Sequence, residues 1–235
     1  MAELGFDVEA IENPADGNLV RYNFIYQAQA AGFYFKGQPG TSTDIVPDYN
    51  YLYNNTLYKN GGGVDINPGF QGGVSLRCYS LDAGYPSKGN VLKNNILFDN
   101  TAAVLDRHCI GNGFAYASNF EENPLFVNPD VSTPASLALP NLALQSGSPA
   151  IDGAAELTTV RAGDAGSGTT LSVADARYFQ AGTWGPPGRV TPDAIAVGTT
   201  TNTAQIVAID YASNTIVLAS PLSRRVGDRV WLARK

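Results

Sequence analysis

The densest group of chemically active side chains lies in the segment Leu105-Asp-Arg-His-Cys109. The segment places an acid, a cation and the single histidine of the chain next to one another. Carboxylates and imidazoles transfer protons, and a guanidinium neutralises an anionic substrate. A hydrogen-bonded histidine at a corner of the chain also explains the segment, and we favour that interpretation. The candidate catalytic residues are Arg77, Asp82, Asp106, Arg107 and His108.

Four short segments share the pattern Gly-apolar-x-apolar, which indicates a strand entered at a glycine. They are Gly5–Val8, Gly32–Phe35, Gly63–Ile66 and Gly73–Leu76. If these strands stack in register, their outward side chains form columns. The candidate substrate-binding residues are Asp7, Tyr34 and Asp65 in one column and Glu9, Lys36 and Asn67 in the next.

These columns carry side chains that suit a sugar chain. Aromatic faces pack against sugar rings, while carboxylates and amides form hydrogen bonds with hydroxyl groups. Two neighbouring carboxylates could also hold Ca²⁺, the one cofactor that the sequence suggests. A solvated outer face explains the same residues without a ligand, and we favour it over catalysis.

The cysteine count argues against a structural zinc site. The chain has two cysteines and one histidine, whereas such a site needs four nitrogen or sulfur ligands. Cys78 and Cys109 are separated by 31 positions, close to one repeat of the chain. A disulfide and a pair of buried thiols both remain open.

An asparagine phrase organises the first half of the chain. Asn18-Leu-Val-Arg-Tyr-Asn23 recurs at Asn50–Asn55 and Asn90–Asn95, so that the second asparagines are 32 and 40 residues apart. Each phrase predicts two short strands that meet at an asparagine bend. Stacking of such repeats predicts a parallel solenoid with ladders of hydrogen-bonded asparagines. An antiparallel β-sandwich is the alternative, but it does not require the same phrase three times.

The segment from Asp7 to Asn100 resembles the later coils of right-handed parallel β-helix proteins of the pectate-lyase-like superfamily. The phrases Asn123-Pro-Leu-Phe-Val-Asn-Pro129 and Gly147-Ser-Pro-Ala-Ile-Asp-Gly153 are similar to the closing segment of bacterial members. Because that superfamily includes lyases, hydrolases, epimerases, tailspikes and non-catalytic proteins, the resemblance implies a fold more than an activity.

For an enzyme of this kind, the resemblance implies one of two chemistries. A lyase would use a basic residue to abstract a proton, and Arg77, Lys88 or Arg107 could fill that role. A hydrolase would use paired aspartates, here Asp82 with Asp106. The sequence departs from a complete member because it has few coils and no visible N-terminal cap. We therefore expect the open end of the stack to favour self-association.

The second half of the chain follows a different pattern. The asparagine phrase stops after Gly153, and segments of alternating apolar and polar residues follow, separated by turns such as Tyr211-Ala-Ser-Asn214. We expect an all-β fold: a right-handed parallel β-helix with its closing segment over residues 1–153, then a small antiparallel β-barrel or sheet module over residues 154–235.

Composition narrows the function. The net charge of −6 argues against a nucleic-acid binder, which would show a basic surface, and against docking onto an anionic membrane surface. The function that we expect is that of a polysaccharide-binding module of a secreted, extracellular bacterial protein, with no signal peptide visible at Met1–Leu4. The alternatives are a polysaccharide lyase or glycoside hydrolase acting on an acidic or plant-type glycan, and a structural fibre or tailspike-like element.

Overall fold

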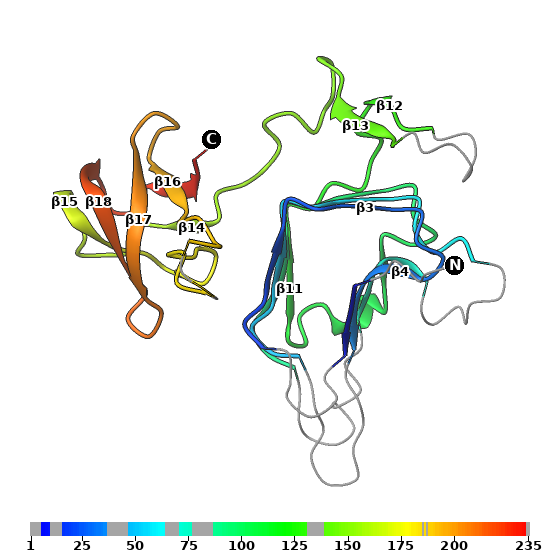
Figure 1. Ribbon diagram of the computed structural model, residues 1–235, viewed down its shortest axis with the longest axis horizontal. Coiled ribbons are helices and arrows are strands. Elements are labelled where there is room, and N and C mark those ends of the chain that lie inside the picture. The colour runs from blue at the N-terminus through cyan, green and yellow to red at the C-terminus, as the bar shows by residue number, and fades with distance from the viewer. Residues whose placement is uncertain are drawn as a thin grey trace, which may run out of the picture. The chain divides into compact units, whose positions relative to one another are not determined.

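The computed structural model shows an all-β protein (Figure 1). It describes residues 6–9, 16–36, 47–63, 71–76, 87–130, 139–184, 186 and 188–233, with only the backbone of residues 6–9 and of Lys36. The chain folds as two compact units, Met1–Ala154 and Ala155–Lys235.

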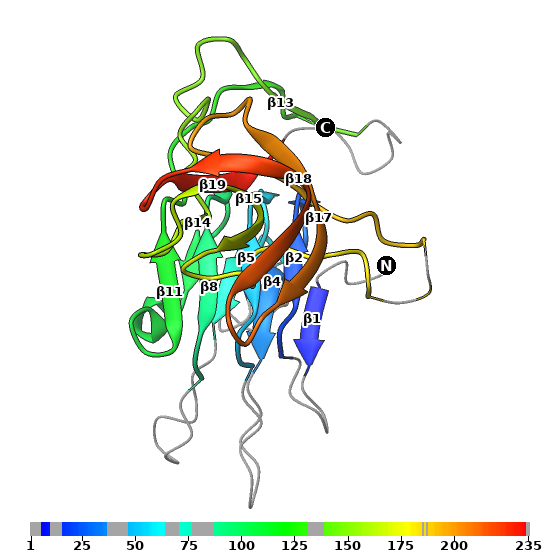
Figure 2. The same cartoon turned by 90° about the vertical axis from the view of Figure 1, so that its left-hand side faces the viewer.

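The first unit contains three parallel sheets. Sheet A holds β1 (Phe6–Glu9), β4 (Ala31–Lys36), β7 (Gly72–Leu76) and β10 (Val104–Leu105), in that order. Sheet B holds β11 (Phe114–Ala117), β8 (Asn90–Lys93), β5 (Tyr51–Tyr53) and β2 (Leu19–Arg21), which lie side by side in Figure 2. Sheet C holds β3 (Phe24–Tyr26), β6 (Thr56–Tyr58) and β9 (Ile96–Phe98). The chain passes through sheets B, C and A in turn, which makes the unit compatible with a β-helix.

Equivalent residues of successive repeats lie directly beside one another. In sheet B, Val20 pairs with Leu52 and Leu52 with Leu92. In sheet C, Ile25 pairs with Leu57 and Leu57 with Leu97. These side chains point inward and form one core with Phe33, Phe35 and Phe114. The alternation of apolar and polar residues along each strand therefore builds a narrow apolar interior.

The predicted asparagine ladders are confirmed. At each rung, one asparagine donates both its backbone N–H and its side-chain amide to Oδ1 of the equivalent asparagine in the next repeat, at 2.8–3.1 Å. The ladders are Asn18–Asn50–Asn90, Asn23–Asn55–Asn95–Asn119 and Asn60–Asn100. Because buried amides need partners, the ladders satisfy the polar groups at the bends and fix the register of the stack.

A short antiparallel pair, β12 (Phe126–Asn128) and β13 (Asn141–Leu144), covers part of the outer face of sheet C (Figure 1). Phe126 and Leu142 pack against Tyr58 in a second, smaller apolar cluster. This cluster explains why Tyr58, which points away from the core, is only 2 % exposed.

The second unit is a six-stranded antiparallel sheet, as predicted. Its order is β14 (Thr158–Thr159), β19 (Arg229–Leu232), β16 (Ala194–Val197), β17 (Thr203–Asp210), β18 (Thr215–Arg224) and β15 (Gly166–Ser172). A single antiparallel bridge between Val160 and Val173 joins the two ends of the sheet, so that it curls back on itself. Phe179 and Tyr178 lie in its interior.

Among the residues that the structure describes, no helix reaches the length and apolarity that crossing a membrane requires. The one helical element in the described ranges is a single turn of 3-10 helix, η3 (Arg107–Cys109).

Candidate functional site

The segment with the candidate catalytic residues follows β10 at the end of the stack. Asp106 adopts a left-handed conformation with φ 58°, and η3 begins at the next residue. Arg107 Nη2 donates to both carboxylate oxygens of Glu121 at 2.6 Å. The Tyr116 hydroxyl donates to Glu121 Oε1 at 2.5 Å, and the guanidinium carbon lies 5.4 Å from the centre of the Tyr116 ring. We call Arg107, Tyr116 and Glu121 the end plug.

The hydrogen bonds within the end plug favour the charged forms of Arg107 and Glu121. The hydrogen bonds that Arg107 donates to Glu121 raise the pKa of Arg107 against the opposing effect of burial. Burial alone would raise the pKa of Glu121, but the hydrogen bonds from Arg107 and Tyr116 and the Arg107 charge outweigh it and lower that pKa. Burial and the bond to Glu121 raise the pKa of Tyr116. Arg107 therefore holds its proton firmly, which does not suit a general base.

The position of the end plug indicates a structural role. Tyr116 pairs with Leu92 in the inward column of sheet B, and it packs against the core. Because β11 is the last strand of sheet B, the plug lies where the apolar interior would otherwise open to water. A satisfied polar cluster at this place closes the C-terminal end of the stack.

The other members of the candidate catalytic set do not assemble into a site within the described residues. His108 is exposed, and its backbone carbonyl accepts a hydrogen bond from Asn112 at 2.8 Å. His108 Nε2 lies 3.8 Å from Sγ of Cys109, which is buried and disulfide-bonded. Arg77, Asp82 and the other cysteine, Cys78, lie outside the described residues. The described ranges contain no group of three His, Cys, Asp or Glu residues that could hold a metal ion.

The expected columns of sheet A form in part. Asp7 pairs with Tyr34, and Glu9 pairs with Lys36. The next neighbour of Tyr34 is Ser75 of β7, not Asp65, and Leu105 follows Ser75. The expectation for Asp65 is therefore wrong in register: the glycine phrase at Gly73 supplies the strand. Asp65 and Asn67 themselves lie outside the described residues.

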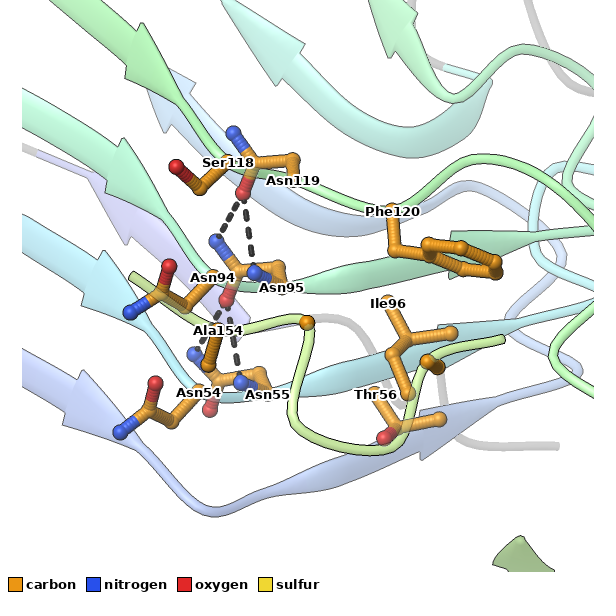
Figure 3. A pocket seen from close by; sticks show the side chains of 12 residues that line it. Asn54, Asn55, Thr56, Asn94, Asn95, Ile96, Ser118, Asn119, Phe120 and Ala154 are labelled. Atoms are coloured by element: carbon orange, nitrogen blue, oxygen red, sulfur yellow. Dashed lines mark hydrogen bonds between the residues drawn. The ribbon is translucent and has the colours of Figure 1, made fainter. Parts of the chain in front are cut away.

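A groove runs along the bend between sheets B and C (Figure 3). Its volume is about 360 Å³. We call it the bend groove. It is lined by Asn54, Asn55, Thr56, Asn94, Asn95, Ile96, Ser118, Asn119, Phe120, Ala150, Gly153 and Ala154.

The repeats position the lining of the bend groove in three rows. The first row is Asn54, Asn94 and Ser118, which stand at the bends in the left-handed conformation with φ 55°, 56° and 52°. Asparagine tolerates this conformation better than most residues. The second row is the ladder of Asn55, Asn95 and Asn119, and the third is Thr56, Ile96 and Phe120.

The rows differ in their chemistry. Figure 3 shows the ladder amides bonded to one another, while the side chains of Asn54, Asn94 and Ser118 point the other way from Thr56, Ile96 and Phe120. Asn54 makes one long hydrogen bond, 3.4 Å from Nδ2 to the Tyr22 hydroxyl. The groove thus has amides and a hydroxyl along one side and an aliphatic and an aromatic side chain along the other.

None of the twelve lining residues is charged. Side-chain amides both donate and accept hydrogen bonds, so they match hydroxyl groups in either direction. An aromatic ring offers an apolar face. The bend groove therefore suits an uncharged ligand that is rich in hydroxyl groups, and it lacks the oxygen anions that a divalent cation requires.

The sequence analysis missed both the bend groove and the end plug. The doubled asparagines at Asn54-Asn55 and Asn94-Asn95 were a usable signal, because only one asparagine of each pair is needed for the ladder. The wall at Ala150–Ala154 had no such signal, since nothing in its composition places it beside the bends. Comparisons with protein-family models, with curated proteins and with solved structures found no match.

Proposed function

We propose that this chain is a polysaccharide-binding module of an extracellular bacterial protein, built as a right-handed parallel β-helix of the pectate-lyase-like kind with an antiparallel β-barrel appended. The observation that carries the proposal is the bend groove: a row of uncharged amide and hydroxyl groups on one side of the asparagine ladder, and a row that includes Ile96 and Phe120 on the other, repeated at the spacing of the strands.

Binding in the groove divides between the two rows. The amides of Asn54 and Asn94 and the hydroxyl of Ser118 form hydrogen bonds with the sugar hydroxyls. Phe120 and Ile96 cover the C–H face of a sugar ring, which removes apolar surface from water. Because the ladder holds the backbone of each bend, the amides are already positioned, and little conformational entropy is lost on binding.

The absence of charge in the lining sets the type of glycan. An uncharged or weakly charged polysaccharide fits the groove, whereas a uronate polymer would leave its carboxylates without a cationic partner there. Calcium remains a proposal for the columns of sheet A, outside the groove. We therefore expect the groove to bind without calcium.

A glycan array probed with the 235-residue chain, with and without calcium, tests the proposal. We expect retention of uncharged polysaccharides that persists in a chelator and no release of products. The Asn54→Ala/Asn94→Ala double variant should lose about tenfold or more in affinity, since each lost hydrogen bond contributes about 1 kcal/mol. The matched control is Asn112→Ala, which removes an exposed amide elsewhere.

The array also separates the alternatives. Release of unsaturated uronides or reducing ends would show a lyase or a hydrolase and would overturn the binding-module proposal. Loss of all glycan retention together with a detergent-resistant trimer would favour the fibre or tailspike-like element. Equal retention of the double variant and wild type would exclude the bend groove as the site.

A further inference from the structure

All the asparagine ladders run in the same direction, from the first repeat toward the C-terminal end of the stack. Asn95 shows the pattern of an inner rung. Its backbone N–H and its Nδ2 both donate to Asn119 Oδ1, at 3.0 Å and 2.8 Å, and Nδ2 also donates to the Leu52 carbonyl at 2.8 Å. The last asparagine of each ladder therefore directs two N–H donors toward the place where a further Oδ1 would lie.

The first ladder shows which group can fill that place. Asn90 ends this ladder and is 1 % exposed. Its backbone N–H donates to the Gly113 carbonyl oxygen at 3.0 Å, and its Nδ2 lies 3.5 Å from the same oxygen. The carbonyl oxygen of an amide thus takes the place of the missing asparagine.

The second ladder ends in the bend groove. Asn119 is its last rung, as Figure 3 shows, and its Nδ2 keeps the bond to the preceding repeat, 2.9 Å from the Leu92 carbonyl oxygen. In the described part of the chain, no group accepts its backbone N–H or the second hydrogen of its Nδ2, and the residue is partly exposed. Unlike Asn90, Asn119 therefore presents two converging N–H donors to a ligand in the groove.

We propose that this donor pair makes the bend groove specific for N-acetylated sugars. The inference rests on the proposed function and deepens it by naming the substituent that the groove recognises. The carbonyl oxygen of an acetamido group accepts both N–H donors of Asn119, as the Gly113 carbonyl does at Asn90. Phe120, the next residue and a member of the groove's third row, offers an apolar surface to the acetamido methyl group.

A sugar hydroxyl matches the donor pair less well than a carbonyl. A carbonyl oxygen has two lone pairs and no hydrogen, so it can accept both donors at once. A hydroxyl group carries a hydrogen of its own, which needs a further acceptor when the group leaves water. The pair therefore favours a glycan with acetamido groups over one with hydroxyl groups alone.

A carboxylate also accepts two hydrogen bonds, but the charges near Asn119 disfavour it. Glu121 and Glu122 follow two and three residues later in the chain. Arg107 pairs with Glu121, which leaves the negative charge of the exposed Glu122 uncompensated within the described residues. An anionic ligand would be repelled there, whereas a neutral acetamido group would not.

The third ladder supplies an internal comparison. Asn100 ends it, with Nδ2 donating to the Leu57 carbonyl at 2.9 Å. No described residue accepts its backbone N–H or its second Nδ2 hydrogen. Asn100 does not line the bend groove. It therefore has the same two donors without the groove, which makes it the matched control for Asn119.

Two uncharged trimers test the proposal: β-1,4-linked N-acetylglucosamine and β-1,4-linked glucose. They share their linkage and differ in an acetamido group against a hydroxyl group at each ring. Titration calorimetry of the full chain should show about tenfold or more tighter binding of the N-acetylglucosamine trimer, the effect of one to two additional hydrogen bonds. Equal affinities, or tighter binding of the glucose trimer, would overturn the proposal.

A pair of variants assigns the preference to Asn119. Asn119→Asp keeps the acceptor for Asn95 but replaces the side-chain donor with a carboxylate, which repels a carbonyl oxygen. We expect the ratio of the two affinities to fall to about one in Asn119→Asp and to be kept in Asn100→Asp. A ratio that survives in Asn119→Asp would overturn the proposal.

Nuclear magnetic resonance of the wild-type chain tests the same contact without a variant. The backbone amide signal of Asn119 should shift with the N-acetylglucosamine trimer and shift less with the glucose trimer, while that of Asn100 should shift with neither. Equal shifts at Asn100 and Asn119 would overturn the proposal, because ladder ends would then bind the acetamido group without the groove.

The glycan array separates this inference from the proposed function. Equal retention of uncharged glycans with and without acetamido groups would overturn the inference alone and leave the binding module in place. Retention of no glycan would overturn both.

Discussion

The side-chain amide of Asn100 occupies the space that a side chain on Gly73 would need. A Cβ built on Gly73 would lie 2.9 Å from Asn100 Nδ2 and 2.8 Å from the carbonyl oxygen of Ala103. Gly32 stands in the same relation to Asn60, at 2.8 Å. The glycine of the Gly-apolar-x-apolar phrase is thus required by the third asparagine ladder, because a larger residue would displace the rung.

Gly73→Ala should therefore destabilise the first unit. The methyl group forces Asn100 or the Ala103 backbone to move, and such overpacking costs about 1–3 kcal/mol. Chemical denaturation measures the free energy of unfolding. Gly62→Ala is the matched control, because a Cβ there meets no atom within 4 Å and no unusual φ is involved. Equal free energies of unfolding for the two variants would show that the close approach of Gly73 to Asn100 and Ala103 does not affect stability.

Asn95 is the rung whose loss should cost most. It is fully buried, its Oδ1 accepts two hydrogen bonds from Asn55, and its Nδ2 donates to the Leu52 carbonyl at 2.8 Å and to Asn119. Asn95→Ala leaves these buried partners without a bond, at a cost of roughly 2–4 kcal/mol.

Asn95→Asp adds a test of the direction of the ladder. A carboxylate retains the acceptor but loses the donor, and it would face the oxygens of Leu52 and Asn119. We therefore expect the Asp variant to be less stable than wild type at neutral pH and to regain part of the difference in acid, where the protonated acid donates one bond. A variant as stable as the exposed Asn112→Ala control at pH 7 would contradict the role of the rung.

The end plug predicts a dependence of stability on pH. The folded structure lowers the pKa of Glu121, so its contribution is fully present above the ordinary glutamate pKa of about 4.3 and is lost as the pH falls through the lowered folded value. Glu121→Gln should be less stable than wild type at neutral pH, and the two should converge at the acid end. Thermal unfolding between neutral pH and pH 3 measures this. A constant difference over the whole range would count against the assignment.

The second unit depends on a buried ion pair. Asp164 accepts bonds from Arg224, with Nε at 2.8 Å, and the two side chains are 16 % and 8 % exposed. Asp164→Asn leaves the Arg224 charge buried without its partner, which costs about 3–5 kcal/mol. Glu156→Gln breaks the exposed pair with Arg229, at 3.6 Å, and should cost less than about 1 kcal/mol. Calorimetry of the full chain should show the effect of Asp164→Asn only in the unfolding transition of the second unit.

Much of the architecture was predictable because the repeats have closely similar sequence patterns. The phrase from Asn50 to Asn55 and its copy from Asn90 to Asn95 fix both the strands and the ladder, since one bend geometry serves every repeat. The pairing of Asp7 with Tyr34 followed from the same regularity. The antiparallel second unit followed from its alternating segments.

The register of sheet A could not be predicted at Gly63. Two Gly-apolar-x-apolar phrases, at Gly63 and Gly73, compete for one place in that repeat. Local pattern does not distinguish them. The deciding contact is the fit of Gly73 over Asn100, which is 27 positions away in the sequence and appears only when the repeats are stacked.

The chemistry was harder to predict than the fold. Arg107 was identified as a candidate base, but its partners Tyr116 and Glu121 follow no motif and meet it only at the end of the stack. The bend groove needs the segment at Ala150–Ala154, whose path no local pattern encodes. Sites formed by segments distant in sequence are therefore where the sequence analysis was incomplete.

The side-chain amide signals of an isotope-labelled chain test the central claim most directly. In a titration with the uncharged oligosaccharide that the glycan array retains best, the signals of Asn54 and Asn94 should shift with a common affinity, while that of the buried Asn95 should shift less. Shifts confined to the outer face of sheet A around Tyr34 and Lys36, or no shift at Asn54 and Asn94 at saturation, would contradict the account.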